Sequence, residues 1–273
     1  MKNIQSKSLL TLIIIVFIIG FSTSGKNFIE RIGETYLYTA PISSDTAGTL
    51  VKNPKWVSYP TILADHREES KEYVKQYSSR QRSYIIYMFK RGKSYFPRAV
   101  KIFAKYNVPY ELQMLPALES NFNAQAVSPV GAVGYWQFMP TLARDYGLHI
   151  DGEIDERKDF TKSTIAAAKF FRDQLKYFNN DILLTVAAYN CGEGRVSLAI
   201  RNSGKENADF WDIKKYLPAE TRKFVLRFVS LNVIAANYDK FLSGKLNFSE
   251  PHLVESPIED SLKQENSLTS NSL

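Results

Sequence analysis

The chain of 273 residues is 44% hydrophobic and 13% aromatic and has a formal net charge of +7. It is long and apolar enough to bury a core, as one main domain with extensions. Its Lys and Arg residues are interspersed rather than clustered with aromatics, which argues against nucleic-acid binding. The charge favours residence on an anionic polymer such as cell wall, or on a membrane surface, and an ordinary solvated basic surface explains it equally well.

Residues 1–24 predict a secretory signal peptide. Lys2 and Lys7 form a basic start, residues 9–21 are apolar, and residues 22–24 are small, which is the order typical of such a signal. The apolar run is short for a membrane helix, which needs about 20 residues. An uncleaved membrane anchor is the alternative. We therefore expect an exported protein of the periplasm or cell envelope, with membrane association if the segment is retained.

After this segment, residues 25–65 predict an irregular lead-in, and helical apolar spacing over residues 68–109 predicts two helices. Residues 110–119 form a third helical segment, which Pro116 should bend or tighten just before Glu119. Ser128-Pro129, Gly131 and Gly134 predict that a loop comes next, followed by a short helix in "MPTLARDYGL". "DGEIDERKDF" predicts a turn with local ion pairs and helix caps.

Three longer helices follow in the pattern. "TKSTIAAAKFFRDQLKYF" is amphipathic, and "NDILLTVAAYNC" is almost entirely apolar and ends at Gly192. The run 217–241 begins at Pro218, has Glu220 in its first turn, and extends for about six turns. No run alternates with period two, so the fold class is mainly α. Residues 243–273 lack a core-forming period and predict a disordered tail.

The stretch "LQMLPALESNFNAQAVSPVGAVGYWQFMP", residues 112–140, carries a single acidic residue, Glu119. A carboxyl group among Leu115, Leu118, Phe122 and Trp136 would be desolvated, which raises its pKa. A carboxylic acid that stays protonated near neutral pH can protonate a leaving oxygen. From the residues alone, a half-buried glutamate with a structural ion-pair partner is an equal alternative.

Metal and cofactor chemistry finds no support in the sequence. His66, His149 and His252 are scattered, and none has a second ligand at metal-binding spacing. Cys191 is the single cysteine, so it forms no disulfide within the chain, and without a paired histidine it is interpreted as a small turn residue. We expect no metal site and no cofactor.

Five segments resemble, in order, the soluble-lytic-transglycosylase catalytic domain, and most closely the membrane-bound murein transglycosylase D branch. They are "VPYELQMLPALES", "AVSPVGAVGYWQFMPTLARDYGL", "DERKDFTKSTIAAAKFF", "AAYNCGEGRV" and "LPAETRKFV". The resemblance covers roughly residues 95–240 and implies a lysozyme-like helical domain with a cleft, over residues 95–242. Residues 25–94 before it are expected to form an irregular and helical N-terminal extension. Many members of the branch also carry C-terminal LysM repeats, and residues 243–273 do not resemble one.

The resemblance implies an enzyme that cleaves the β-1,4 bond between N-acetylmuramic acid and N-acetylglucosamine in peptidoglycan. Glu119 would protonate the leaving oxygen and then accept the proton of the muramic acid C6 hydroxyl, which closes onto C1 as a 1,6-anhydro ring. Glycosidases usually use two carboxylates, and the sequence places no second one on the opposite cleft wall. A lysozyme-type muramidase and a non-catalytic cell-wall-binding module are the alternatives.

By the same resemblance, sugar-holding positions are Ser128, Gln137, Tyr189 and Asn190, and Glu220 lies in the cleft. A helix N-terminal acid is the competing interpretation of Glu220, and a core aromatic that of Tyr189. Three further interpretations rest on sequence position: Met139 lines the cleft, Trp136 packs beneath it, and Ser120 orients Glu119 or merely ends a helix.

Overall fold

The computed structural model describes residues 57–249. The predicted signal peptide, most of the lead-in and the tail from residue 250 lie outside the described residues. The helices in chain order are η2 (Thr61–His66), α3 (Arg67–Arg80), α4 (Arg82–Gly92), α5 (Phe96–Lys105), η3 (Tyr110–Met114), α6 (Leu115–Ser120), α7 (Pro140–Asp145), η4 (Glu156–Lys158), α8 (Phe160–Tyr177), α9 (Ile182–Cys191), α10 (Glu193–Ser203), α11 (Phe210–Ile213), η5 (Lys214–Tyr216), α12 (Ala219–Ala236) and α13 (Tyr238–Leu242), where η marks a 3-10 helix.

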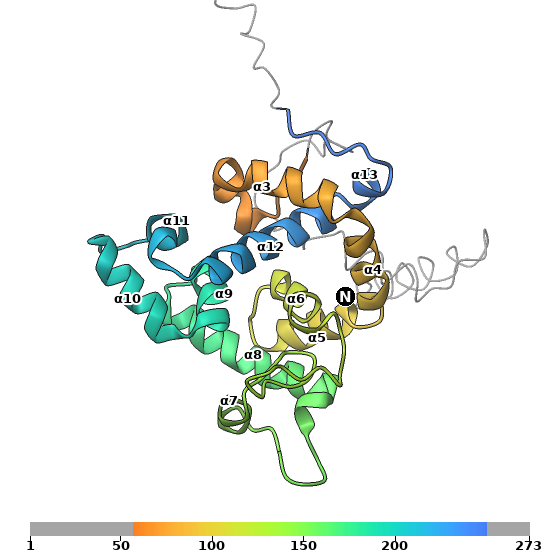
Figure 1. Cartoon of the computed structure of the whole chain (residues 1–273), viewed down its shortest axis with the longest axis vertical. Coiled ribbons are helices and arrows are strands. Elements are labelled where there is room, and N and C mark those ends of the chain that lie inside the picture. Colours follow the sequence, from red (N-terminus) through yellow and green to blue (C-terminus); the bar gives the residue numbers. More distant parts are fainter. Residues whose placement is uncertain (1–56, 250–273) are drawn as a thin grey trace, which may run out of the picture.

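The mainly α fold class is confirmed. Within residues 57–249 there is no β-strand, and the loop regions hold only isolated antiparallel bridges such as Val127 with Val133 and Ile150 with Asp155. Figure 1 shows α12 lying along α3, with α9 and α8 on one side and the short α6 in the middle of the molecule. None of the helices between residues 57 and 249 combines the length and apolar character that a membrane crossing requires.

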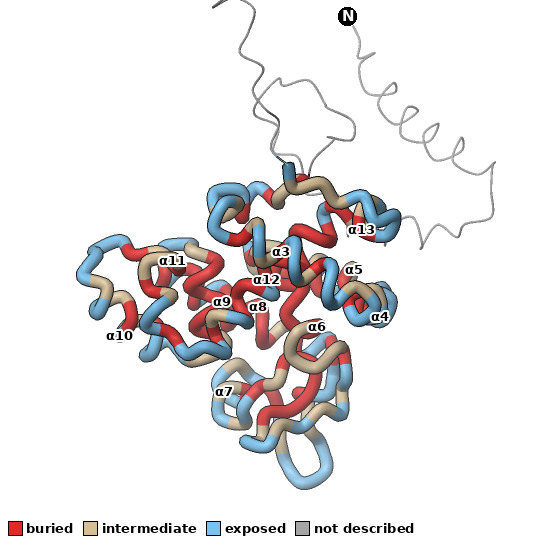
Figure 2. The backbone as a smooth tube through the Cα atoms, turned by 45° about the horizontal axis from the view of Figure 1, so that its top comes forward, coloured by how far each residue is buried: buried red, intermediate tan, exposed pale blue. Residues whose placement is uncertain are grey.

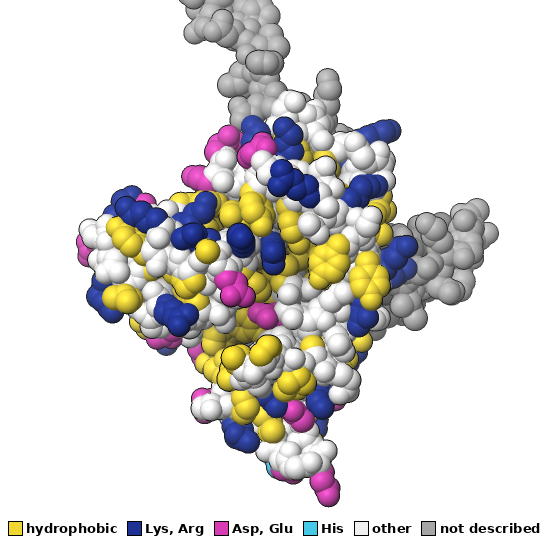
Figure 3. Space-filling view, in the orientation of Figure 1, with side chains coloured by type: hydrophobic (Ala, Val, Ile, Leu, Met, Phe, Trp, Pro, Cys, Tyr) yellow, Lys and Arg dark blue, Asp and Glu magenta, His cyan; other side chains and the backbone are white. Residues whose placement is uncertain are grey.

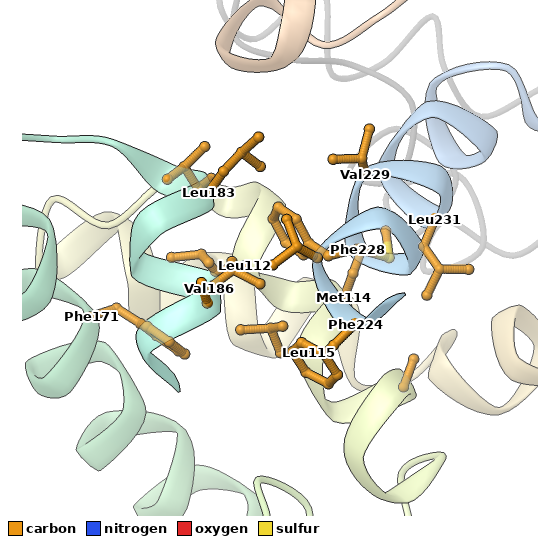
Figure 4. Close-up of a cluster of buried hydrophobic side chains, with 14 of the residues drawn as sticks. Leu112, Met114, Leu115, Phe171, Leu183, Val186, Phe224, Phe228, Val229 and Leu231 are labelled. Carbon is orange, nitrogen blue, oxygen red and sulfur yellow. The ribbon is translucent and has the colours of Figure 1, made fainter. Parts of the chain in front are cut away.

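The core forms around α9 and α12. Every residue of α9 from Ile182 to Ala188 is buried, as the apolar sequence predicts. The C-terminal half of α12 is buried almost continuously, because α3 covers one side of it and α9 packs on another. Figure 4 shows side chains from α9, α12 and the η3–α6 segment meeting in one apolar cluster. The tube in Figure 2 is correspondingly red along these segments and blue at the outer turns.

The expectation of two helices over residues 68–109 is wrong, because the structure has three: α3, α4 and α5. The additional break falls at Gln81, whose backbone leaves the helical region at φ −107° and ψ 16°. The sequence around it contains no proline or glycine. The break lets α4 turn away from α3, and Arg82 at its start donates hydrogen bonds to the carbonyls of Phe241 and Leu242.

The last long helix is also shorter than predicted. α12 spans 18 residues and ends at Ala236, and α13 follows as a separate helix. Asn237 lies at the break, where its side chain accepts from the backbone of Ser58 at 2.9 Å and donates to the Ser58 carbonyl at 2.6 Å. The side chain at the break thus ties the end of α12 to a distant segment of the chain.

The distortion expected near Pro116 is present, but it lies before the proline. η3 has 3-10 geometry, and α6 begins at Leu115 with Pro116 in its first turn. The missing N–H of proline costs nothing there, since the first-turn amides have no partner within the helix. α6 then ends at Ser120, with Asn121 in the left-handed conformation at φ 51°.

The segment predicted to be disordered begins at residue 243, and its described part is packed. Leu246 and Phe248 lie against the core cluster, and the amide of Val57 donates to the carbonyl of Asn247 at 2.8 Å. The start of the predicted tail therefore pairs with the lead-in on the α3 side of the molecule. The other proposed domain boundaries remain predictions.

Candidate active site

The short helix α6 places Glu119 in the middle of the molecule, one residue before its C-terminal end. The side chain is partly buried. Burial is the main cause that raises its pKa from 4.5 to about 8, and the negative charge of Glu220 adds to the rise. A carboxyl group with this pKa is mainly protonated at neutral pH, so it can donate a proton. This is the behaviour predicted from the apolar residues around it.

Glu220 lies in the first turn of α12, where the helix dipole favours an acidic residue. Its charge acts on Glu119, so the two carboxyl groups share one site. The sequence alone placed no second carboxylate near Glu119. In the structure, the start of α12 packs against α6, although the two are far apart in the chain, and this contact brings Glu220 close enough to act on Glu119. The helix-terminal interpretation of Glu220 is confirmed, and its role in a cleft stays a prediction.

Tyr189 belongs to the same site. Burial raises its pKa well above the usual value, and the charge of Glu119 contributes to the rise. Its hydroxyl donates to the carbonyl oxygen of Trp136, and its ring packs against Phe171 at a centroid distance of 5.1 Å. The core-aromatic interpretation is confirmed, since the ring is packed in the core and the hydroxyl anchors the loop; contact of Tyr189 with a sugar stays a prediction.

Asn190, the next residue of α9, is fixed from α12. Its side-chain oxygen accepts a hydrogen bond of 2.8 Å from the hydroxyl of Thr221. Within residues 57–249 its Nδ2 has no hydrogen-bond partner, so this amide remains as a donor for a ligand. Thr221 was not predicted as a site residue, and only its position next to Glu220 in "PAETR" could have indicated it.

The loop between α6 and α7 carries Ser128 and Gln137, whose contact with a sugar stays a prediction. The Gln137 backbone has φ 49°, and its Nε2 donates to the carbonyls of Ala126 at 3.1 Å and Gly134 at 2.9 Å. Its Oε1 therefore remains as an acceptor. The Ser128 hydroxyl accepts from the amide of Ala132 at 2.9 Å, which closes a tight turn. Both polar residues are oriented by the loop itself.

The buried side chain of Arg157 fixes this loop through hydrogen bonds to its backbone. It is 6% exposed and pairs with Asp155 through two hydrogen bonds, of 2.9 and 2.7 Å. Its remaining nitrogen donates to the carbonyls of Gly131 and Phe138, at 3.1 and 3.0 Å. The turn with local ion pairs expected in "DGEIDERKDF" is confirmed, but the burial of Arg157 was not foreseen, because the sequence does not show what its guanidinium reaches.

Gly134 is required where the loop crosses the η4 turn. Its φ is +83°, and a Cβ atom there would lie 2.1 Å from the carbonyl oxygen of Arg157. Any other residue would therefore push the loop away from η4. The close approach holds the loop against η4 three residues before Gln137.

Trp136 is packed as expected, the place of Met139 in a cleft stays a prediction, and Ser120 ends α6, as one of its two interpretations had it. Trp136 is fully buried and donates to the hydroxyl of Thr164 at 3.0 Å, while Met139 is 43% exposed at the start of α7. The Ser120 hydroxyl donates to the carbonyl of Tyr135 at 2.9 Å instead of to the Glu119 carboxylate. Ser120 therefore orients the loop rather than the acid.

Cys191 ends α9, and burial raises the pKa of its thiol. A raised pKa lowers the thiolate fraction, so the thiol lacks the activation that a nucleophile needs. Across residues 57–249, no group of three or more His, Cys, Asp and Glu side chains lies close enough together to hold a metal ion.

Comparison with known proteins gives matches to lytic transglycosylases. Residues 100–211, which include Glu119, match the family described as Transglycosylase SLT domain. Over 178 residues, which are 64% of this chain, the sequence is 38% identical to membrane-bound lytic murein transglycosylase D of Escherichia coli. Over 125 residues, 45% of this chain, it is 38% identical to a putative tributyltin chloride resistance protein of an Alteromonas species. The resemblance found in the sequence is confirmed.

The matches are partial in extent. This chain spans 38% of the length of the Escherichia coli relative and 60% of that of the Alteromonas relative. Among solved structures, a lytic transglycosylase Slt of Pseudomonas aeruginosa superposes with a TM-score of 0.46 at 22% identity, covering 58% of this chain and 26% of the other. The 70 kDa soluble lytic transglycosylase of Escherichia coli superposes with a TM-score of 0.40 at 26% identity, covering 53% and 24%.

Proposed function

We propose that the protein is an exported peptidoglycan lytic transglycosylase with Glu119 as its catalytic acid and base. The observation that carries the proposal is the raised pKa of Glu119, about 8, inside a transglycosylase SLT domain. We expect the protein to act in the bacterial envelope, where peptidoglycan is found. The predicted signal segment and the names of the membrane-bound relatives support that location.

The reaction follows from one protonated carboxyl group. Glu119 donates its proton to the glycosidic oxygen as the bond from that oxygen to C1 of N-acetylmuramic acid breaks. The C6 hydroxyl of the same sugar then attacks C1, and its proton passes to the Glu119 carboxylate. The products are a 1,6-anhydro end and a free N-acetylglucosamine hydroxyl, and no water is consumed. The glutamate returns to its protonated state.

An attack from within the same sugar depends on how that sugar is held. Asn190 supplies an amide donor for the acetamido oxygen, and Gln137 supplies an acceptor for a sugar hydroxyl or N–H. Ser128 and the exposed Met139 border the same loop, and Tyr189 fixes the loop through the Trp136 carbonyl. We assign the first four to substrate contact and Tyr189 to holding the cleft wall.

The position of Glu220 favours a muramidase as the second candidate. A second carboxylate near the acid could activate a water molecule, as in inverting glycosidases. Its charge also raises the pKa of Glu119, a role that both reactions need. The two reactions differ in their products, which are lighter by one water in the transglycosylase.

The test is mass spectrometry of fragments released from purified peptidoglycan by the wild type and by Glu119→Gln. The proposal predicts anhydro-ended fragments with the wild type and none with the variant. Reducing-end fragments would move the assignment to hydrolysis, and Glu220→Gln would then be the variant to examine. If neither protein releases fragments but both sediment with the wall, the binding-module alternative is supported.

A further inference from the structure

A basic pocket lies next to the candidate active site, on the side of α3. It has a volume of about 370 Å³ and combines aromatic, basic and amide side chains from α3, α4, α6 and α12. The lining residues are Tyr73, Gln76, Tyr77, Arg80, Gln81, Tyr84, Leu118, Lys223 and Arg227. Most of this wall lies outside residues 100–211, which match the transglycosylase SLT domain.

The pocket is continuous with the site through two elements. Leu118, which lines it, immediately precedes Glu119 on α6. On α12, Glu220, Lys223 and Arg227 are spaced by three and four residues, so they share one face of the helix. Seven residues of helix span about 10 Å, so this stripe runs from Glu220, whose charge acts on Glu119, to the pocket. Figure 3 shows Lys and Arg side chains gathered over α12 beside acidic and apolar side chains in the middle of this face.

The charge in the pocket is positive. Arg80, Lys223 and Arg227 are exposed, and none of them forms an ion pair within the described residues. No acidic residue lines the pocket. Arg157 is paired with Asp155, whereas these three side chains have no acidic partner within the described residues. Their guanidinium and ammonium groups can therefore pair with the carboxylate of a ligand.

Three tyrosines add an aromatic surface to the positively charged pocket. Tyr73 and Tyr77 stack at a centroid distance of 6.0 Å, and Tyr84 is 45% exposed. Burial raises the pKa of Tyr77 to about 12, and the charge of Arg227 is the largest opposing influence, which places that guanidinium near the phenol. Tyrosine rings offer apolar contact with a hydrogen-bonding end, which suits a peptide better than a simple anion.

We propose that this pocket binds the peptide branch of the glycan strand through one of its carboxylates, while the sugar chain lies across Glu119. The inference rests on the proposed function, because the branch is attached to the muramic acid next to the bond that is cleaved. The branch carries free carboxylates and alkyl side chains, which match the cations and the tyrosines. The helices α3 and α4, which precede the residues that match the SLT domain, thereby contribute a peptide subsite to the proposed active site.

The test compares two probes: soluble glycan strands that carry their peptides, and the same strands freed of peptides by an amidase. The double variant Lys223→Gln, Arg227→Gln is compared with the wild type, and Lys101→Gln, Lys105→Gln on α5 is the matched control for loss of two exposed charges. Dissociation constants are measured in the Glu119→Gln background, so binding does not depend on turnover, and KM and kcat are measured in the active protein.

The proposal expects the pocket variant to raise the dissociation constant and KM about fivefold for peptide-bearing strands, the size that two exposed charge contacts supply. Values for peptide-free strands, kcat and the control variant should not change. The difference should shrink in 0.5 M salt, at a Debye length of about 4 Å. Equal weakening on both probes, or no weakening on either, would overturn the subsite. If the active protein releases no fragments while the binding difference persists, the proposed function fails and the subsite stands.

Discussion

Replacing Glu119 by glutamine should stabilise the protein at neutral pH while it abolishes turnover. The carboxyl group has a folded-state pKa of about 8 against an ordinary value of 4.5. Because the folded pKa is raised, folding is least opposed below pH 4.5, where the group is protonated in both states. The wild type loses stability as the pH rises from 4.5 towards 8, because the unfolded chain gives up this proton more readily.

The size of the effect follows from the pKa. At pH 7, about 2.5 units separate the solution pH from the ordinary pKa, and each unit is worth about 1.4 kcal/mol. Ionisable Glu119 therefore costs at most about 3 kcal/mol at pH 7, and glutamine, which is neutral and of similar shape, removes that cost. For a chain of this size the corresponding rise in Tm is roughly 5–10 °C.

The assay is chemical unfolding of both proteins at a series of pH values from 4 to 8. The difference in the free energy of unfolding should be near zero at pH 4 and grow steadily towards pH 8. Glu153→Gln, on the exposed turn after α7, is the control and should stay within about 0.5 kcal/mol of the wild type. If the gain in the free energy of unfolding of the variant over the wild type were no larger at pH 8 than at pH 4, the burial of Glu119 would be refuted.

Three further changes test the surroundings of the acid. Glu220→Gln removes a like charge, so the pKa of Glu119 should fall and the alkaline limb of the pH–rate profile of kcat/KM should move to lower pH. Gly134→Ala should destabilise the protein by about 2–4 kcal/mol in thermal unfolding, since the Cβ meets the Arg157 carbonyl and the backbone is strained. Arg157→Gln should cost about 1–3 kcal/mol, because it leaves the half-buried Asp155 carboxylate and the carbonyls of Gly131 and Phe138 without their donor, and should lower activity by loosening the loop.

Each of these changes has a control or a contradicting outcome. An alkaline limb that stays in place or moves up in Glu220→Gln would show that the two carboxyl groups do not interact. Gly152→Ala, which meets no atom within 4 Å, should leave the Tm unchanged. Restoration of activity by Arg157→Lys would contradict the role given to the planar guanidinium, which alone reaches Asp155 and two carbonyls together.

The sequence by itself indicated the environment of Glu119. A single acidic residue in a run of apolar ones predicts desolvation and therefore a raised pKa, although a structural ion-paired glutamate was an equal alternative until the fold was known. The helices with strong apolar periods, α8 and α9, and the end of α9 at Gly192 were predictable for the same local reason. The resemblance added which polar residues meet the sugar, and these assignments remain predictions.

Tertiary structure decided what lies far apart in the chain. Glu220 acts on Glu119 only because the start of α12 meets the end of α6, and Asn237, at the break between α12 and α13, is held by Ser58 from a distant part of the chain. The break at Gln81 and the burial of Arg157 likewise carry no local signal. Charge interactions and packing depend on distance in space, so a sequence shows which groups are present, and the fold decides which of them act on each other.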